Sequence, residues 1–255
     1  MNLDRVKAVI SGGASGLGQA TAARLAAGGG QVALLDVQDD HGRKAAATIG
    51  SAASYHHCDV TSEADVDAAV AAAAKRMGGL NVAVACAGVA TPGKLLGKDG
   101  LLPVAAFQRV LAINTLGTFL LDRAAAAIMQ GNAPDADGER GLLIHTASVA
   151  AFEGQIGQVA YATSKAAVAG MVLPLARELA RFGIRVVGIA PGLFGTPMMA
   201  GLPQEAQDSL GKQVPFPPRL GRPEEYADLV AAIVINRMLN GETIRIDGAI
   251  RMAPK

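Results

Sequence analysis

The sequence has little cysteine, little net charge and few clustered basic residues. Only Cys58 and Cys86 occur among 255 residues, so a disulfide framework is not expected. The chain has no C-x-x-C motif and no cysteine–histidine spacing typical of zinc ligands, so we expect no metal site. The formal net charge is +1, with the basic residues scattered. Charge therefore offers no reason to expect nucleic acid or an anionic membrane as a partner.

Long apolar runs are also missing. No uncharged apolar stretch reaches the roughly 18 residues that span a bilayer. The opening residues, "MNLDRVKAVISGG", pass from a charged turn into a short apolar run, which leaves no room for a signal or transit peptide. Hydrophobic residues make up 51% of the chain and charged residues 18%. We expect a soluble, cytoplasmic, globular protein with an ample core.

Short β-branched runs alternate with longer alanine-rich segments along the whole chain. Strands are expected at 6–11, 31–36, 53–59, 81–88, 142–148, 184–192 and 243–248, and helices at 16–29, 40–50, 63–77, 104–130, 159–182 and from Pro223 onwards. Strand–helix alternation at this spacing predicts an α/β fold, a doubly wound Rossmann domain. Its sheet would have seven mainly parallel strands with helices on both faces, in a single domain over 1–255.

A glycine-rich loop, "SGGASGLG" at 11–18, joins the first strand to the first helix. Gly12 would permit a tight turn, while Gly16 and Gly18 would allow close approach of backbone to ligand or of helix to strand. The helix N-terminus that follows can bind a pyrophosphate. The alternative interpretation is a glycine-rich turn without a ligand.

Asp36 favours the nucleotide interpretation of that loop. It ends the second strand, where a carboxylate can accept hydrogen bonds from an adenosine ribose and repel a 2′-phosphate. The site should therefore prefer NAD over NADP. Asp59, at the end of the third strand, could contact the adenine. The alternative for Asp36 is a turn residue before the next helix.

Ser148, Tyr161 and Lys165 form a second candidate site. Tyr161 and Lys165 are four residues apart on a predicted helix and share one face, and Ser148 ends the fifth strand. A nearby ammonium would lower the pKa of the tyrosine and make it a usable general acid/base. The serine could hold the substrate oxygen. Taken singly, these residues are equally compatible with a capping serine, a core tyrosine and a surface lysine, and no G-x-S-x-G motif of a serine hydrolase surrounds Ser148.

Together these features resemble the short-chain dehydrogenase/reductase family over essentially the whole chain. The features that carry the resemblance are "SGGASGLG", Asp36, "CDV" at 58–60, "CAG" at 86–88, Asn114, the Ser148–Tyr161–Lys165 spacing and "PGLFGTPM" at 191–198. The segments "TASVAAFEGQIGQVAY", "QVPFPPRLGRPEEYA" and "NGETIRIDGAIRM" are similar to the narrower family of type 2 3-hydroxyacyl-CoA dehydrogenases, also called type 10 17β-hydroxysteroid dehydrogenases.

The narrower resemblance implies an NAD-dependent homotetramer that oxidises (S)-3-hydroxyacyl-CoA thioesters to 3-oxoacyl-CoA. Its substrates would include a branched intermediate of isoleucine breakdown and some hydroxysteroids. Cys86 replaces the asparagine usual in the wider family and is interpreted as a cofactor contact rather than a redox thiol. Ser11 stands in place of the usual threonine and can make the same local hydrogen bonds. Mitochondrial members carry extra N-terminal residues that this sequence lacks.

The resemblance also assigns roles to individual residues. Tyr161 would be the catalytic acid/base, Lys165 would bind the nicotinamide ribose, Ser148 would hold the substrate oxygen, and Asn114 would position a water in a proton relay. From their place in the sequence between Ser148 and Tyr161, and not from the resemblance, Gln155 and Gln158 are also expected to face the substrate. The residues at cofactor-contact positions are Gly12, Ser15, Gly16, Leu17, Gly18, Asp36, Asp59, Val60, Cys86, Ala87, Gly88, Tyr161, Lys165, Pro191, Phe194 and Thr196.

A segment at about 194–214 is expected to form a substrate lid that is mobile without cofactor. Met198, Met199 and Leu202 would line an acyl pocket there, or simply pack. Two other functions remain open. One is a 3-oxoacyl-carrier-protein reductase or hydroxysteroid dehydrogenase of the same fold, although such a reductase usually prefers NADPH, which Asp36 disfavours. The other is a non-catalytic NAD-binding protein.

Overall fold

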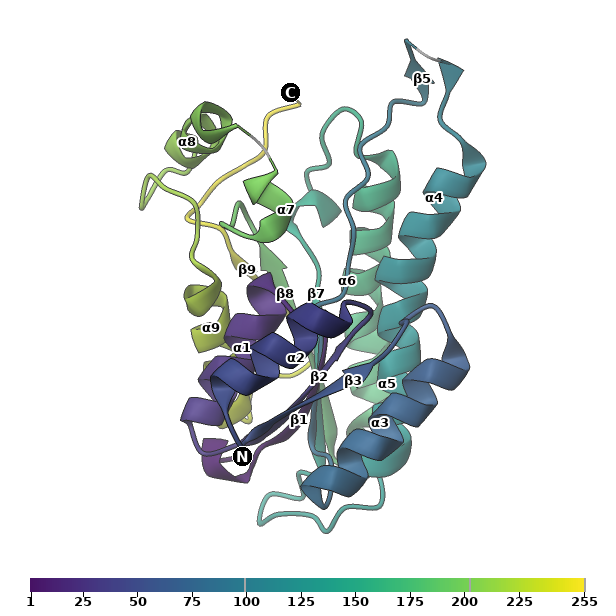
Figure 1. Ribbon diagram of the computed structural model, residues 1–255, viewed down its shortest axis with the longest axis vertical. Coiled ribbons are helices and arrows are strands. Elements are labelled where there is room, and N and C mark those ends of the chain that lie inside the picture. The colour runs from purple at the N-terminus through teal and green to yellow at the C-terminus, as the bar shows by residue number, and fades with distance from the viewer. Residues whose placement is uncertain (99, 202, 255) are drawn as a thin grey trace.

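Seven parallel strands form one twisted sheet through the middle of the molecule (Figure 1). The computed structural model describes residues 1–98, 100–201 and 203–254. Across the sheet the strand order is β3-β2-β1-β4-β7-β8-β9. The bounds are β1 (Lys7–Ser11), β2 (Gln31–Asp36), β3 (Ala53–His57), β4 (Val82–Ala85), β7 (Gly141–Thr146), β8 (Ile184–Pro191) and β9 (Thr243–Ile246). The predicted α/β fold and its seven strands are confirmed.

Helices cover both faces of the sheet, which explains why β2, β4, β7 and β8 are almost continuously buried. One face carries α1 (Gly16–Ala27), α2 (Asp39–Ile49) and α9 (Pro223–Ile235), and the other carries α3 (Glu63–Met77), α5 (Gly117–Met129) and α6 (Val159–Leu179). Alanine dominates the helix surfaces that meet the strands, so the two layers approach closely. Each face therefore has its own apolar core.

The strand order reverses between β1 and β4. From β1 the chain builds outward through β2 and β3, and from β4 it builds the opposite way through β7, β8 and β9. Loops at the carboxyl ends of β1 and β4 diverge at this point, which leaves a crevice where ligands bind in open α/β sheets. The glycine loop follows β1, and the "CAG" segment follows β4.

The long helical region expected at 104–130 is interrupted. It consists of α4 (Val104–Leu111), a π-helical turn η2 (Ala112–Leu116) and α5. A π-turn inserts one extra residue, and such turns often occur at functional sites. Here the turn contains Asn114, which is fully buried. Periodicity alone did not predict the interruption, because a π-turn leaves the apolar pattern nearly unchanged.

Two expected loops contain regular structure. The loop at 90–103 carries a small antiparallel pair, β5 (Leu96–Gly97) and β6 (Gly100–Leu101). The predicted lid contains two short helices rather than one, α7 (Pro197–Ala200) and α8 (Gln204–Lys212). In Figure 1 β5 and α8 both lie beyond the carboxyl ends of the sheet strands.

Two helical stretches, Val104–Met129 and Val159–Phe182, are long and apolar enough to span a membrane by composition. Both belong to the layer that packs on the sheet. α5 contacts β4 and β7, and α6 contacts β7 and β8. Packing of this kind is that of the core helices of a globular domain.

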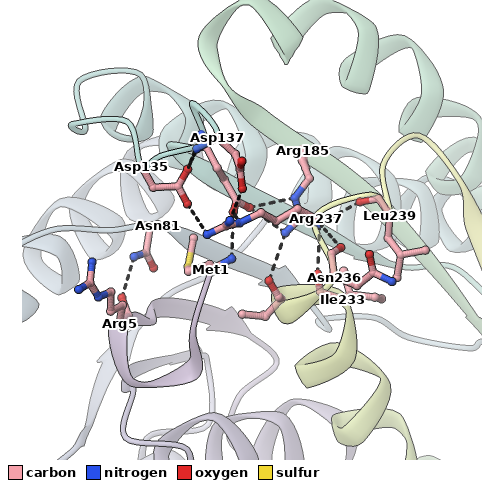
Figure 2. Close-up of polar contacts among 12 residues, drawn as sticks. Met1, Arg5, Asn81, Asp135, Asp137, Arg185, Ile233, Asn236, Arg237 and Leu239 are labelled. Carbon is pink, nitrogen blue, oxygen red and sulfur yellow. Dashed lines mark hydrogen bonds and ion pairs between the residues drawn. The ribbon is translucent and has the colours of Figure 1, made fainter.

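The opposite end of the sheet is held by a cluster of charged groups (Figure 2). Arg185, at the start of β8, is buried and donates to the Ile233 and Leu239 carbonyls at distances of 3.1 and 2.8 Å. It also donates to the buried Glu139 carboxylate at 2.7 Å. Arg237 binds Asp135 and Asp137 on the insert at 131–141. These ion pairs fix the insert, correctly expected as a loop, far from the crevice.

Candidate active site

The glycine loop is built too tightly for side chains at three positions, Gly12, Gly13 and Gly18. Gly12 has a φ of +64°, and a Cβ there would lie 2.7 Å from the Ala87 amide nitrogen. At Gly18 a Cβ would collide with the Gly12 carbonyl oxygen. The loop is therefore packed directly against the segment after β4 on one side and against the first turn of α1 on the other. Ser15, the residue before α1, makes no side-chain cap, which leaves its hydroxyl and the first N–H groups of the helix available to a phosphate.

Asp36 is almost fully buried at the end of β2, beside the glycine loop. Its two carboxylate oxygens accept hydrogen bonds from the Ala14 and Gln38 amides, each at 3.1 Å. Two backbone donors hold the carboxylate in one orientation, and each oxygen retains a lone pair for a further donor. Asp36 thus orders the turn before the next helix, and its carboxylate can still accept hydrogen bonds from a ligand.

The segments after β3 and β4 complete the nucleotide side of the crevice. Asp59 accepts hydrogen bonds from the Thr61 amide and hydroxyl, at 2.9 and 2.8 Å, and these bonds lower the pKa of its carboxyl. Val60 is buried and packs where Gly117 leaves room on α5. The Ser11 hydroxyl accepts a hydrogen bond from the Ala87 amide at 3.3 Å, as expected for its position.

Lys165 lies inside the molecule, with 5% of its surface exposed. Its Nζ donates to the Thr146 carbonyl at 2.6 Å, and burial lowers the pKa of the amine to about 8. A Cβ at Gly88 would lie 3.5 Å from this nitrogen and 3.3 Å from the Asn114 Oδ1. The "CAG" segment and the catalytic candidates therefore adjoin one another in the crevice, as the sequence predicted.

Tyr161 lies on the same face of α6, with the Lys165 Nζ 5.9 Å from its ring centroid. Burial raises the pKa of the Tyr161 hydroxyl, and a side-chain hydrogen bond with Ser148 lowers it. The expectation that Lys165 depresses this pKa is therefore wrong for the structure as it stands. The Lys165 amine donates its hydrogen bond to the Thr146 carbonyl, and Ser148 is the group that opposes the effect of burial on the pKa of Tyr161.

Ser148 is buried at the end of the β7 segment and accepts a hydrogen bond from the Ala150 amide at 3.1 Å. That contact matches the alternative interpretation of a capping serine, because Ser148 precedes the 3₁₀ turn η3 (Val149–Ala151). Ser148 is also close enough to Tyr161 to lower the pKa of its hydroxyl. The two interpretations of Ser148 are compatible.

The π-turn gives Asn114 a fixed place beside these groups. Its side chain accepts from the Val89 amide at 2.8 Å and donates to the Val89 carbonyl at 3.0 Å. The amide also donates to the Ser164 hydroxyl at 2.9 Å, and Ser164 donates to the Tyr161 carbonyl at 2.7 Å. Ser164 thus links α6 to the π-turn. Sequence reasoning missed it because its partner lies 50 residues away.

Tyr226 was also missed. It is fully buried on α9, and its hydroxyl lies 2.7 Å from the Thr146 hydroxyl, which in turn donates to the Cys86 thiol at 3.5 Å. Burial raises the pKa of Cys86, as it does in an unreactive thiol. The interpretation of Cys86 as a contact residue rather than a redox group is consistent with this packing.

The predicted lid begins directly above the glycine loop. A Cβ at Gly16 would lie 3.3 Å from the Pro197 ring and 3.6 Å from Thr196. Phe194 is buried against Gly221, and Pro191 ends β8. Leu17 packs at the edge of the core beneath α1. Leu202 and the side chain of Met198 lie outside the described residues, so the predicted acyl-lining role of this segment stays a prediction.

Gln155 and Gln158 use their polar atoms on the protein itself. The Gln155 amide nitrogen Nε2 donates to the Ala253 carbonyl at 3.0 Å, and the Gln158 Oε1 accepts from the Gln155 backbone at 3.0 Å. The two glutamines therefore shape the loop between Ser148 and Tyr161. Each side-chain amide keeps a further N–H and a further lone pair, so the expected contact of Gln155 and Gln158 with substrate stays a prediction.

Comparison with known proteins decides the family. A model of the short chain dehydrogenase family matches residues 6–207. The chain belongs to the short-chain dehydrogenase family. Among its relatives is 3-hydroxyacyl-CoA dehydrogenase type-2, 53% identical in Homo sapiens (97% of this chain, 95% of the relative) and 52% identical in Drosophila melanogaster (96% and 97%).

More distant short-chain dehydrogenases match over the same length. Ipsdienol dehydrogenase from Ips pini is 36% identical, covering 95% of this chain and 96% of that one. A solved structure of 3-hydroxyacyl-CoA dehydrogenase type-2 from Mycobacterium avium is 40% identical and superposes with a TM-score of 0.92, covering 98% and 97% of the two chains. The protein is thus an oxidoreductase that uses a nicotinamide cofactor. The crowded glycine loop, the uncapped Ser15 and the oriented Asp36 carboxylate fit such a dinucleotide.

Proposed function

We propose that the protein is an NAD-dependent 3-hydroxyacyl-CoA dehydrogenase that converts (S)-3-hydroxyacyl-CoA thioesters of short or 2-methyl-branched chain to 3-oxoacyl-CoA. The observation that carries the proposal is identity above 50% with relatives of that name over nearly the full length of both chains. The Ser148–Tyr161–Lys165 geometry supports secondary-alcohol chemistry. A non-catalytic NAD-binding role is disfavoured because the three residues meet in the crevice.

The preference for NAD rests on Asp36. A buried carboxylate held by two backbone amides cannot turn away from a ligand, so a 2′-phosphate would meet its negative charge in a poorly solvated place. The 2′- and 3′-hydroxyls of an adenosine ribose can instead donate to its free lone pairs. Asp36 therefore favours the cofactor without the phosphate.

Each catalytic residue has a task in this reaction. A nicotinamide cofactor, held by the glycine loop, Asp36 and Lys165, would supply the hydride acceptor for the alcohol carbon. Ser148 holds the substrate oxygen by a hydrogen bond, and Tyr161 removes the hydroxyl proton. Lys165 supplies a buried positive charge beside the Tyr161 ring and can bind a ribose hydroxyl. Asn114, fixed by Val89 and Ser164, holds the π-turn in place so that a water can pass the proton onward.

Three further proposals concern the setting of the enzyme. Hydroxysteroids are proposed as additional substrates, on the resemblance alone. A homotetramer is supported by exposed apolar side chains such as Leu116 and Phe119 on the outer face of η2 and α5. A cytoplasmic location is supported by Cys58 and Cys86, which are both unpaired.

A kinetic panel tests the proposed function. Purified enzyme with NAD should oxidise (S)-3-hydroxybutyryl-CoA and its 2-methyl analogue faster than estradiol, the (R)-thioester or a carrier-protein thioester. With NADP in place of NAD, kcat/KM should fall by at least about 100-fold, because a buried like-charge contact costs several kcal/mol. Asp36→Asn should reduce the ratio of kcat/KM with NAD to kcat/KM with NADP.

The contrary outcomes are equally specific. A faster rate on the carrier-protein thioester would identify a 3-oxoacyl-carrier-protein reductase, and a faster rate on estradiol would identify a hydroxysteroid dehydrogenase. Equal use of NAD and NADP by the wild-type enzyme would contradict the role of Asp36. NADH binding without turnover of any alcohol or ketone would leave only a binding function.

A further inference from the structure

The loop at 152–158, the wall loop, runs from the segment of Ser148 to the helix of Tyr161 and therefore adjoins both catalytic candidates. Its polar side chains are occupied, since Gln155 and Gln158 bond each other and the chain beyond β9. Its exposed side chains are apolar. Phe152 and Ile156 have exposed fractions of 55% and 56%. The exposed surface of the wall loop is therefore apolar.

The chain after β9 runs back to this loop, and Figure 1 shows it ending at the carboxyl end of the sheet near α7 and α8. Three hydrogen bonds join the C-terminal tail, residues 250–254, to the loop. The Met252 amide donates to the Glu153 carboxylate at 3.0 Å, the Gln155 side chain donates to the Ala253 carbonyl at 3.0 Å, and the Ile156 amide donates to the Pro254 carbonyl at 3.0 Å.

Glu153 is the centre of this attachment. Arg245 of β9 binds both of its oxygens, at 2.8 and 3.2 Å, and also binds Asp247 at 2.7 Å. Arg251 of the tail adds a contact to Glu153 at 3.4 Å. The hydrogen bonds from Arg245 hold the pKa of Glu153 below its usual range. Bidentate, charge-assisted bonds of this kind define position closely.

Arg245 also fixes the apolar part of the wall. Its guanidinium carbon lies 5.7 Å from the centroid of the Phe152 ring. On the other side of the loop, the Gly93 amide donates to the Gly157 carbonyl at 2.8 Å. The loop is thus suspended between the tail and the segment that leads to β5, and it cannot shift without breaking bonds on one side.

We propose that the C-terminal tail, residues 250–254, is a structural part of the substrate-binding wall, and that Glu153 is a positioning residue for the acyl group of the substrate. The tail and Arg245 hold Glu153, Glu153 holds the loop, and the loop presents Phe152 and Ile156 to the acyl chain. The inference rests on the proposed function only for the identity of the ligand as an acyl thioester.

The test compares Glu153→Gln with the wild type on acetoacetyl-CoA and 3-oxodecanoyl-CoA, with NADH as reductant. A glutamine keeps the size of the side chain but loses the charge that binds Arg245. KM for acetoacetyl-CoA should rise about tenfold, the effect of losing one charge-assisted bond. KM for the longer thioester should rise further, because a longer chain covers more of the wall. The Kd of NADH should stay unchanged.

Two other variants make the result decisive. Ile156→Ser alters an exposed side chain, so it should fold normally, and it should raise KM for the longer thioester alone. Glu178→Gln removes an exposed carboxylate at the far end of α6 and serves as the matched control, with no change expected. Equal KM values for wild type, Glu153→Gln and Ile156→Ser would overturn the inference. If Glu153→Gln does not fold, Ile156→Ser decides alone.

Failure of the proposed function gives a different signature. A wild-type enzyme that reduces neither thioester would refute the assignment to acyl-CoA. The role of the tail would then be judged on whichever ketone the enzyme does reduce, by the same comparison of KM with the Kd of NADH. A changed Kd for NADH in Glu153→Gln would show a general structural effect and would count against a role specific to the substrate.

Discussion

At the scale of single residues, the burial of the Lys165 amine lowers the free energy of unfolding. Burying an amine without a carboxylate partner disfavours its charged form, and the Thr146 carbonyl offsets only part of that penalty. An amine with a pKa of about 8 is still mostly charged at neutral pH. The protein therefore keeps a cation in its interior at the expense of stability, because the active site requires one.

This cost predicts a pH dependence of stability. In the unfolded chain the amine has its ordinary pKa of 10.5, so between about pH 8 and 10.5 the native state binds fewer protons than the unfolded state. The free energy of unfolding contributed by this group therefore rises with pH across that window and is constant below it. Over the whole window the gain is about 3 kcal/mol.

Urea unfolding of wild type and Lys165→Met checks this prediction. The wild type should gain about 2 kcal/mol relative to the variant between about pH 7 and pH 9.5. Lys44→Met, which removes an exposed amine from α2, controls for the loss of one positive charge. A constant difference between wild type and Lys165→Met at all pH values would show that the amine is not buried in its charged form.

Tyr161→Phe should remove most turnover while NADH still binds, because the ring remains and the proton acceptor is lost. A reduction of kcat by about 10²- to 10⁴-fold is expected for a general acid/base. Since burial raises the pKa of Tyr161, alcohol oxidation by the wild type should accelerate as the pH rises and more phenolate forms. Steady-state kinetics with a fluorescence titration of NADH separate the two effects, and retained turnover would exclude Tyr161 as the catalytic base.

At the scale of elements, α5 and β7 are joined by a pair that contributes nothing visible to the chemistry. Asp122 on α5 and His145 on β7 are both buried, with their Oδ2 and Nε2 atoms 2.7 Å apart. Their relative orientation is poor for a hydrogen bond, and the His145 Nδ1 has no partner in the described part of the chain. Such a pair stabilises a fold only if both members are present.

The pair predicts non-additive stability. Asp122→Leu alone should lower the free energy of unfolding by about 1–3 kcal/mol, since it leaves the polar His145 ring inside the protein with no partner on α5. The double variant Asp122→Leu with His145→Leu should recover most of that loss. Thermal and urea unfolding of both variants and of His145→Leu measure the coupling, and additive effects would show that the two residues act independently.

At the scale of the whole molecule, the strand–helix rhythm was sufficient to predict the sheet, because both faces of a parallel sheet must be covered and its strands are therefore apolar throughout. The positions of Asp36, Ser148, Tyr161 and Lys165 were predictable for a related reason. Each lies at a strand end or on a helix turn whose place is set by that rhythm, and the sheet order brings them to one edge.

The features of the site that were not predicted depend on partners that are distant in sequence. Ser164 binds Asn114, Tyr226 binds Thr146, and Glu153 binds Arg245, with separations of 50, 80 and 92 residues. No local pattern encodes such pairs. The π-turn was not predicted for another reason, which is that one extra residue in a helix barely alters the apolar face of the helix. The bond of Gln155 to the tail could not be predicted either, because Ala253 lies 98 residues away.

The position of the charged cluster around Arg185 affects which residues of this enzyme can be substituted during evolution. It ties the insert at 131–141 to the end of α9, at the edge of the sheet farthest from the crevice. None of the residues that handle hydride or proton belongs to it. Substitutions can therefore accumulate in this cluster without altering the catalytic residues, provided that both members of a buried ion pair such as Arg185 and Glu139 change together.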